Sequence, residues 1–124
     1  MTARRILLVE DDRFLRRAGE VSLRQRGFGV ATAVDGEEAL RKIRAEPFDL
    51  ILLDLLMPRM TGIEVLKALR ADEATRGIRV LILSNSSREQ DVEEIKTLGV
   101  SGYFVKADLS LQALGDMVAR LLEA

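Results

Sequence analysis

Five short runs of consecutive apolar residues limit the possible folds more than any other feature of the chain. The runs are Ile6–Val9, Phe28–Ala33, Leu50–Leu53, Val80–Leu83 and Gly102–Val105. Runs of four to six residues without polar alternation are typical of strands buried on both faces of a parallel sheet. Segments with helical spacing separate them, the first from about Arg13 to Arg26. We therefore expect an α/β fold, a doubly wound (βα)5 arrangement around a five-stranded parallel sheet.

Residues that begin and end helices occur where this pattern needs them. Gly27 and Gly99 follow the first and fourth amphipathic segments, as glycines that terminate helices do. Asp35 and Ser87 precede the second and fourth segments and are predicted to cap them. Pro47 ends the second helical region. These local signals agree with the period of the apolar residues.

The size and charge of the chain limit the classes of function that it can have. The chain has 124 residues, with 19 Lys and Arg against 20 Asp and Glu. We expect one domain over residues 1–124, with no output domain. The near balance of charge gives no sign of direct binding to nucleic acid or to an anionic membrane. No apolar run is long enough to span a membrane, so a cytoplasmic protein is expected.

The residues that could bind a metal or take part in a reaction lie at the ends of the predicted strands. Strand one is followed by Glu10, Asp11 and Asp12, and strand three by Asp54. In a doubly wound sheet these ends meet at one edge, where ligands bind. The chain lacks His and Cys, so a metal there would be held by oxygen, which favours Mg²⁺ or Ca²⁺ over zinc. Asp54 is the best candidate for a functional charge, because it interrupts an otherwise apolar segment.

Strands four and five add a hydroxyl and an ammonium group to the same edge, at Ser84 and Lys106. A carboxylate can act as the nucleophile in phosphoryl transfer. A nearby lysine can neutralise the incoming phosphoryl group, and a serine can donate to one of its oxygens. The chemistry that these residues suit is acceptance of a phosphoryl group on Asp54.

Four motifs, in order, resemble the receiver domains of bacterial two-component response regulators over essentially the whole chain. They are the segments 6–12 (ILLVEDD), 49–62 (DLILLDLLMPRMTG), 80–84 (VLILS) and 102–106 (GYFVK). The second motif is the most specific. The resemblance implies the flavodoxin-like receiver fold and a single-domain protein similar to chemotaxis receivers. It further implies a signalling module, not an enzyme that turns over a substrate.

By this resemblance, Asp54 is the phosphoacceptor and part of a Mg²⁺ site that would also accept Mn²⁺. Glu10 and Asp11 form the acidic pair, with Asp11 a direct ligand and Glu10 acting through water. The backbone carbonyl of Leu56 is the remaining protein ligand. Asp12 lies just outside the pair.

The resemblance also assigns three residues to the switch. Ser84 is the hydroxyl that moves toward the phosphoryl group, Lys106 neutralises its charge, and Tyr103 is an aromatic residue that turns inward on activation. The donor would be a histidine kinase or a histidine phosphotransfer protein. An unknown downstream protein would bind the face built from the fourth helix, fifth strand and fifth helix.

The sequence departs from the family pattern in two places. Ala107 follows Lys106 where the family usually has proline, and Asp108 is then expected to cap the last helix. Asn85 follows Ser84 where a small residue is usual, and its bulk would restrict access to Asp54. Leu56, moreover, cannot orient a water molecule, which predicts slow loss of the phosphoryl group.

Other interpretations remain open from the sequence. A pseudo-receiver would use the same fold for constitutive binding without phosphorylation, although the acidic set argues against it. A small phosphatase or nucleotide-binding enzyme of flavodoxin-like fold is disfavoured because no glycine-rich phosphate loop is present.

Five arginines lie on or next to the first helix, which in the family helps to dock the phosphodonor; a solvated face is the expected role here. They are Arg13, Arg16, Arg17, Arg24 and Arg26.

Overall fold

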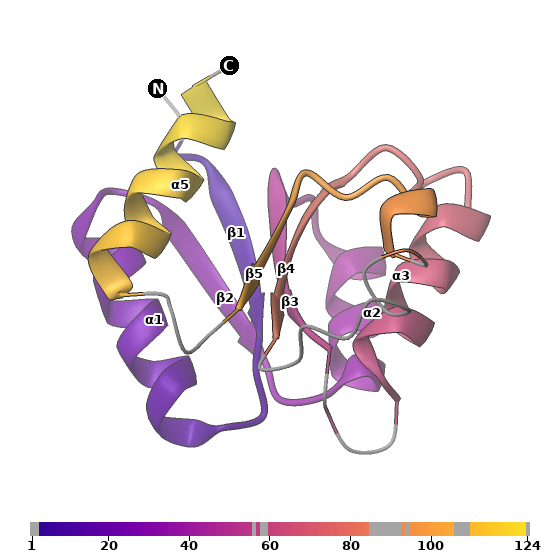
Figure 1. Ribbon diagram of the computed structural model, residues 1–124, viewed down its shortest axis with the longest axis horizontal. Helices are drawn as coiled ribbons and strands as arrows, with labels where there is room; N and C mark the ends of the chain where they lie inside the picture. The colour runs from indigo at the N-terminus through magenta and orange to yellow at the C-terminus, as the bar shows by residue number, and fades with distance from the viewer. Residues whose placement is uncertain are drawn as a thin grey trace.

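The computed structural model describes residues 3–55, 57, 60–84, 93, 95–105 and 110–123, and it forms a single parallel sheet between two layers of helices (Figure 1). The elements are β1 (Arg5–Val9), α1 (Arg13–Gln25), β2 (Gly29–Ala33), α2 (Gly36–Ala45), β3 (Leu50–Asp54), α3 (Gly62–Ala71), β4 (Arg79–Ser84), β5 (Gly102–Val105) and α5 (Leu111–Glu123). The strand order is β2-β1-β3-β4-β5, which confirms the predicted doubly wound sheet.

The two faces of the sheet have separate cores, because side chains alternate along each strand. Leu7, Val9 and Ile51 face α2 and α3, whereas Leu8 and Leu52 face α1 and α5. All of these side chains are almost completely buried. The strands are therefore apolar on both sides, as their continuous runs predicted.

The predicted helix ends are confirmed where the structure describes them. Gly27 and Gly99 have φ angles of 94° and 71°, in the region that favours glycine. The Asp35 carboxylate caps α2 by accepting from the Glu38 amide at 2.8 Å, and Glu38 accepts in turn from the Val34 amide. The fourth predicted helix is described only at residues 93 and 95–97, which are helical, so its Ser87 cap lies outside the described residues.

The last helix is capped by Ser110, whose hydroxyl accepts from the Ala113 amide at 3.0 Å. The expected cap, Asp108, lies outside the described residues. Ser110 immediately precedes α5, and its carbonyl also accepts from the Leu114 amide. A serine in this position satisfies amide groups that would otherwise have no partner in the helix.

Strand β2 lies at one edge of the sheet, and two cationic side chains cover that edge. The carbonyls of Val30 and Thr32 point away from β1, because Ala33 uses its own carbonyl to accept from Glu10 on the β1 side. Arg24 of α1 donates to the Val30 carbonyl at 2.9 Å, and Lys42 of α2 donates to that of Thr32. Both outward carbonyls are thus hydrogen-bonded to side chains.

Arg70, near the end of α3, joins three parts of the chain. Its guanidinium donates to the carbonyls of Arg76 and Ile78 before β4, and to those of Leu98 and Gly99 before β5, at distances between 2.7 and 3.0 Å. Partial burial lowers the pKa of Arg70 below its usual value. The contacts tie the turn at Gly99 to α3 and β4.

Among the described residues, no helix has both the length and the apolar character needed to cross a membrane.

Candidate functional site

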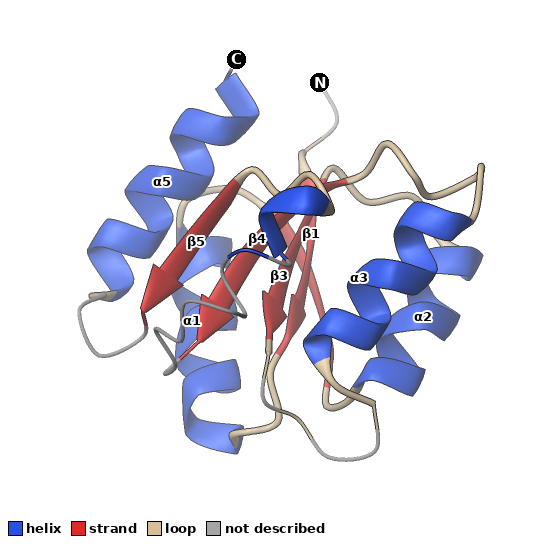
Figure 2. Ribbon diagram, turned by 45° about the vertical axis from the view of Figure 1, so that its right-hand side comes forward, coloured by secondary structure: helices blue, strands red, loops and turns tan. Residues whose placement is uncertain are grey.

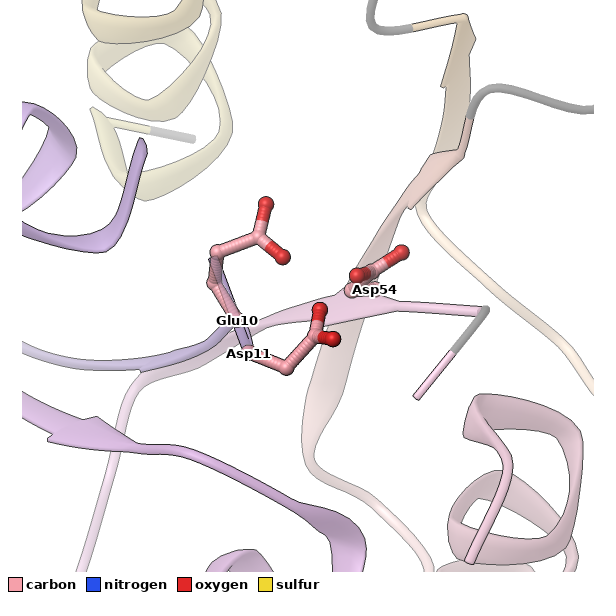
Figure 3. Close-up of side chains that lie close together, drawn as sticks. All are labelled: Glu10, Asp11 and Asp54. Carbon is pink, nitrogen blue, oxygen red and sulfur yellow. The ribbon is translucent and has the colours of Figure 1, made fainter. Parts of the chain in front are cut away.

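Three carboxylates converge where the sheet order reverses, between β1 and β3. Each of Glu10, Asp11 and Asp54 offers an oxygen, and these oxygens all lie within 4.8 Å of one another. Figure 3 shows Glu10 and Asp11 projecting from the end of β1 and Asp54 from the end of β3, with their carboxyl groups facing a common space. The predicted meeting of these residues is confirmed.

The register of the sheet produces this arrangement. Val9 pairs with Leu53, so the next residues along the two strands, Glu10 and Asp54, emerge side by side. The arrowheads of the strands all lie at one edge of the sheet (Figure 2). Asp54 and Glu10 are only 3% and 4% exposed, whereas Asp11 is exposed. The cluster is therefore largely buried, with one of its three carboxylates exposed to solvent.

The three carboxylates fit a small divalent cation. Carboxylates this close repel one another, and a cation between them removes the repulsion. Mg²⁺ binds oxygen at about 2.0–2.1 Å, so ligands on opposite sides of the ion are about 4.2 Å apart. The separations here suit one or two direct carboxylates with a third acting through water. The donor set is thus of the kind that holds Mg²⁺ in proteins.

The switch residues are only partly within the described structure. Ser84 ends β4 and is fully buried, one residue beyond Leu83, which pairs with Asp54. Tyr103 lies on β5, half-buried against the core on the α2–α3 face of the sheet. Lys106 and Leu56 lie outside the described residues.

Two residues near the cluster support the site in ways that the sequence did not show. Asp12 caps α1, with its Oδ1 accepting from the amides of Phe14 and Leu15 at 2.9 and 3.1 Å. Gly62, the first residue of α3, packs against the backbone of Asp54 and Leu55 and donates from its amide to the Leu55 carbonyl. The sequence carried no sign of what this glycine touches.

Four of the five arginines on or next to the first helix are exposed, as a solvated face requires, and most of the five also bond within the molecule. Arg17 and Arg24 pair with Glu20 at 3.1 and 3.0 Å, as residues three or four positions apart on a helix can. Arg26 reaches Asp116 of α5 at 2.9 Å. Arg16 donates to the backbone after β1.

Comparison with known families identifies the chain. The family model described as response regulator receiver domain matches residues 6–119. The chain belongs to the response regulator receiver domain family. This receiver domain is 36% identical over 120 residues to the chemotaxis protein CheY of Pseudomonas aeruginosa, covering 96% of each. It is 39% identical over 121 residues to the transcriptional regulatory protein PrrA of Mycobacterium tuberculosis, covering 98% of the receiver domain and 49% of PrrA.

Solved structures agree with the family. The receiver domain superposes on the chemotaxis protein CheY4 of Vibrio cholerae with a TM-score of 0.89 at 32% identity, covering 97% of this chain and 99% of that one. The response regulator TrrA of Thermotoga maritima, solved in complex with Mg²⁺ and BeF, matches with a TM-score of 0.82 at 29% identity, covering 95% and 98%. The protein is thus a receiver domain of two-component signalling.

Proposed function

We propose that this receiver domain accepts a phosphoryl group on Asp54 in a site that holds Mg²⁺ with Glu10 and Asp11. The observation that carries the proposal is the convergence of the three carboxylates within 4.8 Å at the carboxyl edge of the sheet. The Mg²⁺–BeF complex of TrrA supports it, since that related receiver was solved with both components bound.

The chemistry follows from the donor set. An oxygen of Asp54 attacks the phosphorus of a phosphohistidine, the P–N bond breaks, and the imidazole leaves with a proton from solvent. A bound Mg²⁺ supplies positive charge for the phosphoryl oxygens. Asp11 would hold the ion directly, Glu10 would act through water, and the Leu56 carbonyl would be the remaining protein ligand. Burial of Asp54 keeps bulk water away from its reactive oxygen.

Ser84 and Lys106 complete the proposed mechanism. Ser84 ends β4, the strand adjacent to β3, and is buried, which supports a role in which its hydroxyl donates to a phosphoryl oxygen after a small movement. Lys106 follows β5 directly in the sequence, and its ammonium group would neutralise a second oxygen. The domain assists its own phosphorylation in this way.

The proposed donor, a histidine kinase or histidine phosphotransfer protein, docks over the start of α1. Phe14 is 87% exposed there, and Leu15 and Leu111 are also exposed apolar residues. Leu15 and Leu111 line a small cavity of about 80 Å³ that reaches Glu10, so this apolar surface is continuous with the acidic cluster. A donor that covers it would bring its histidine to Asp54 and exclude water.

The signal would leave through the face that contains β5 and α5. Tyr103 lies on that strand and is half-buried, a position from which an inward movement would change the surface. It is the only tyrosine, and the chain has no tryptophan. Intrinsic fluorescence therefore reports on Tyr103 alone, and addition of Mg²⁺ with beryllofluoride is expected to change it.

Intact-mass analysis after incubation with acetyl phosphate and Mg²⁺ tests the proposal. The wild type should gain one phosphoryl group, and Asp54→Ala should gain none. Asp12→Asn is the matched control, because asparagine is also a good helix cap and should leave phosphorylation intact. A wild type that gains no phosphoryl group with Mg²⁺ present would favour the pseudo-receiver interpretation, and a phosphorylated Asp54→Ala would remove Asp54 as the acceptor.

A further inference from the structure

One residue, Arg16, holds the three carbonyls that follow β1. Its backbone amide donates to the Asp12 carbonyl at 2.9 Å. Its Nη1 atom donates to the Glu10 carbonyl at 3.0 Å and to the Asp11 carbonyl at 3.3 Å. Arg16 lies on the first turns of α1 and is half-buried, so its side chain runs back along the helix toward the end of the strand.

The other bonds of this segment leave Glu10 and Asp11 little freedom. The Glu10 amide donates to the Ala33 carbonyl of β2 at 3.0 Å, which extends the sheet pairing by one residue. The Asp12 side chain is used as the cap of α1. With the Glu10 amide held by β2 and the Glu10 carbonyl held by Arg16, the two peptide planes on either side of Glu10 both have set orientations. Arg16 also holds the Asp11 carbonyl, so the backbone sets the Cα–Cβ directions from which both carboxylates extend.

We infer that Arg16 is a positioning residue for the metal site, holding the backbone of Glu10 and Asp11 so that their carboxylates face Asp54. This inference rests on the proposed function, because it assumes that the three carboxylates bind a divalent ion. The Arg16 guanidinium donates to the Glu10 and Asp11 carbonyls, so it acts on these two ligands through their backbone. Residues that orient metal ligands in this way affect metal affinity strongly.

Electrostatics alone predicts that removing Arg16 changes the metal affinity in the opposite direction. The sign of the change in affinity therefore tests the inference. Arg16 carries a positive charge near the site, and a positive charge repels Mg²⁺. If charge were its only influence, removing Arg16 would strengthen metal binding. If Arg16 positions the ligands, removing it weakens binding although a repulsive charge has been lost.

The experiment measures Mn²⁺ affinity of the unphosphorylated protein by titration, with free Mn²⁺ followed by electron paramagnetic resonance. Mn²⁺ suits the same oxygen ligands as Mg²⁺. Arg16→Met keeps an unbranched apolar stem but loses the donors, and it should raise the Kd about tenfold. Arg16→Lys keeps the charge on a shorter stem and should raise the Kd about threefold.

Arg17→Met is the matched control, since it removes one positive charge from the neighbouring position and leaves the carbonyls held. Its Kd should stay at the wild-type value or fall. Thermal unfolding of each metal-free variant establishes that it is folded. If Arg16→Met does not fold, Arg16→Lys decides, because its charge is unchanged and only the geometry differs.

If the folded Arg16 variants bound Mn²⁺ as tightly as the wild type or more tightly, the inference would be overturned. The proposed metal site would still stand in that case, because the wild type itself binds Mn²⁺. A wild type that binds no Mn²⁺ would instead overturn the proposed metal site, and Arg16 would then have no metal ligands to position. The two failures are therefore distinguished by the wild-type titration.

Discussion

Replacement of Gly62 by alanine should disturb both the stability of the domain and the position of Asp54. A Cβ atom at Gly62 would lie 2.4 Å from the Asp54 carbonyl oxygen and 2.7 Å from the Leu55 Cα atom. The first distance is about 1 Å short of the 3.4 Å at which ordinary contact begins. Both neighbours are backbone atoms, so no flexible side chain can move aside. The strand end or the start of α3 must shift.

The magnitude follows from two opposed effects. Overpacking a close contact costs about 1–3 kcal/mol of the free energy of unfolding. Alanine is a better helix former than glycine by up to about 1 kcal/mol in a helix interior, and Gly62 is only the first residue of α3. We expect a net loss of about 1–2 kcal/mol, which lowers the melting temperature by roughly 4–8 °C for a chain of this size.

The same shift should slow phosphorylation, because the atom that is displaced belongs to the proposed acceptor. A misplacement of about 1 Å in a reacting group can reduce a rate by about 100-fold, so a loss of 10- to 100-fold is expected with acetyl phosphate and Mg²⁺. Melting is followed by circular dichroism, and phosphorylation by intact mass over time.

Gly77→Ala is the control for this experiment. Nothing lies within 4 Å of a Cβ atom placed at Gly77, and alanine there should leave stability unchanged or raise it by about 0.4–1 kcal/mol. If Gly62→Ala melted at the wild-type temperature and accepted phosphate at the wild-type rate, the steric argument would be refuted.

Two other substitutions have clear expected outcomes. Leu56→Asn should lose its phosphoryl group several-fold faster than the wild type, because an amide can orient an attacking water and a leucine cannot; equal decay of the isolated phosphoproteins would contradict this. Arg70→Met should lower the free energy of unfolding by about 2–4 kcal/mol, since four backbone carbonyls lose a charged donor. Arg76→Met, which loses only an exposed contact of 4.0 Å with Glu73, should change it by less than about 1 kcal/mol in urea unfolding.

The sequence predicted the sheet and the acidic cluster because both depend on short-range signals. The run from Leu50 to Leu53 is apolar on every residue, a pattern typical of a strand covered on both faces. Once the strands are parallel, their carboxyl ends share one edge, and Glu10, Asp11 and Asp54 must approach one another. The structure shows that Asp54 is the last residue of β3, whereas the apolar run that predicted this strand ended one residue earlier, at Leu53.

Contacts that depend on the exact path of long side chains were not predictable in this way. Nothing in the order of residues tells Arg16, which holds backbone carbonyls, from Arg17, which pairs with Glu20. The difference lies in the rotation of about 100° between successive helical residues, which directs one side chain to the strand end and the other to solvent. The close approach of Gly62 to Asp54 is likewise a property of tertiary packing, for which a single glycine in the sequence is a weak signal.

The cationic cover on β2 has a consequence for how copies of this protein meet. An extended segment from another molecule could lengthen the sheet there only by displacing Arg24 and Lys42 from the Val30 and Thr32 carbonyls. Each displacement would leave a charged group to find a new partner beside the incoming chain. Intermolecular strand addition is thus discouraged at this border, and crowded molecules have one route fewer toward fibrillar assembly.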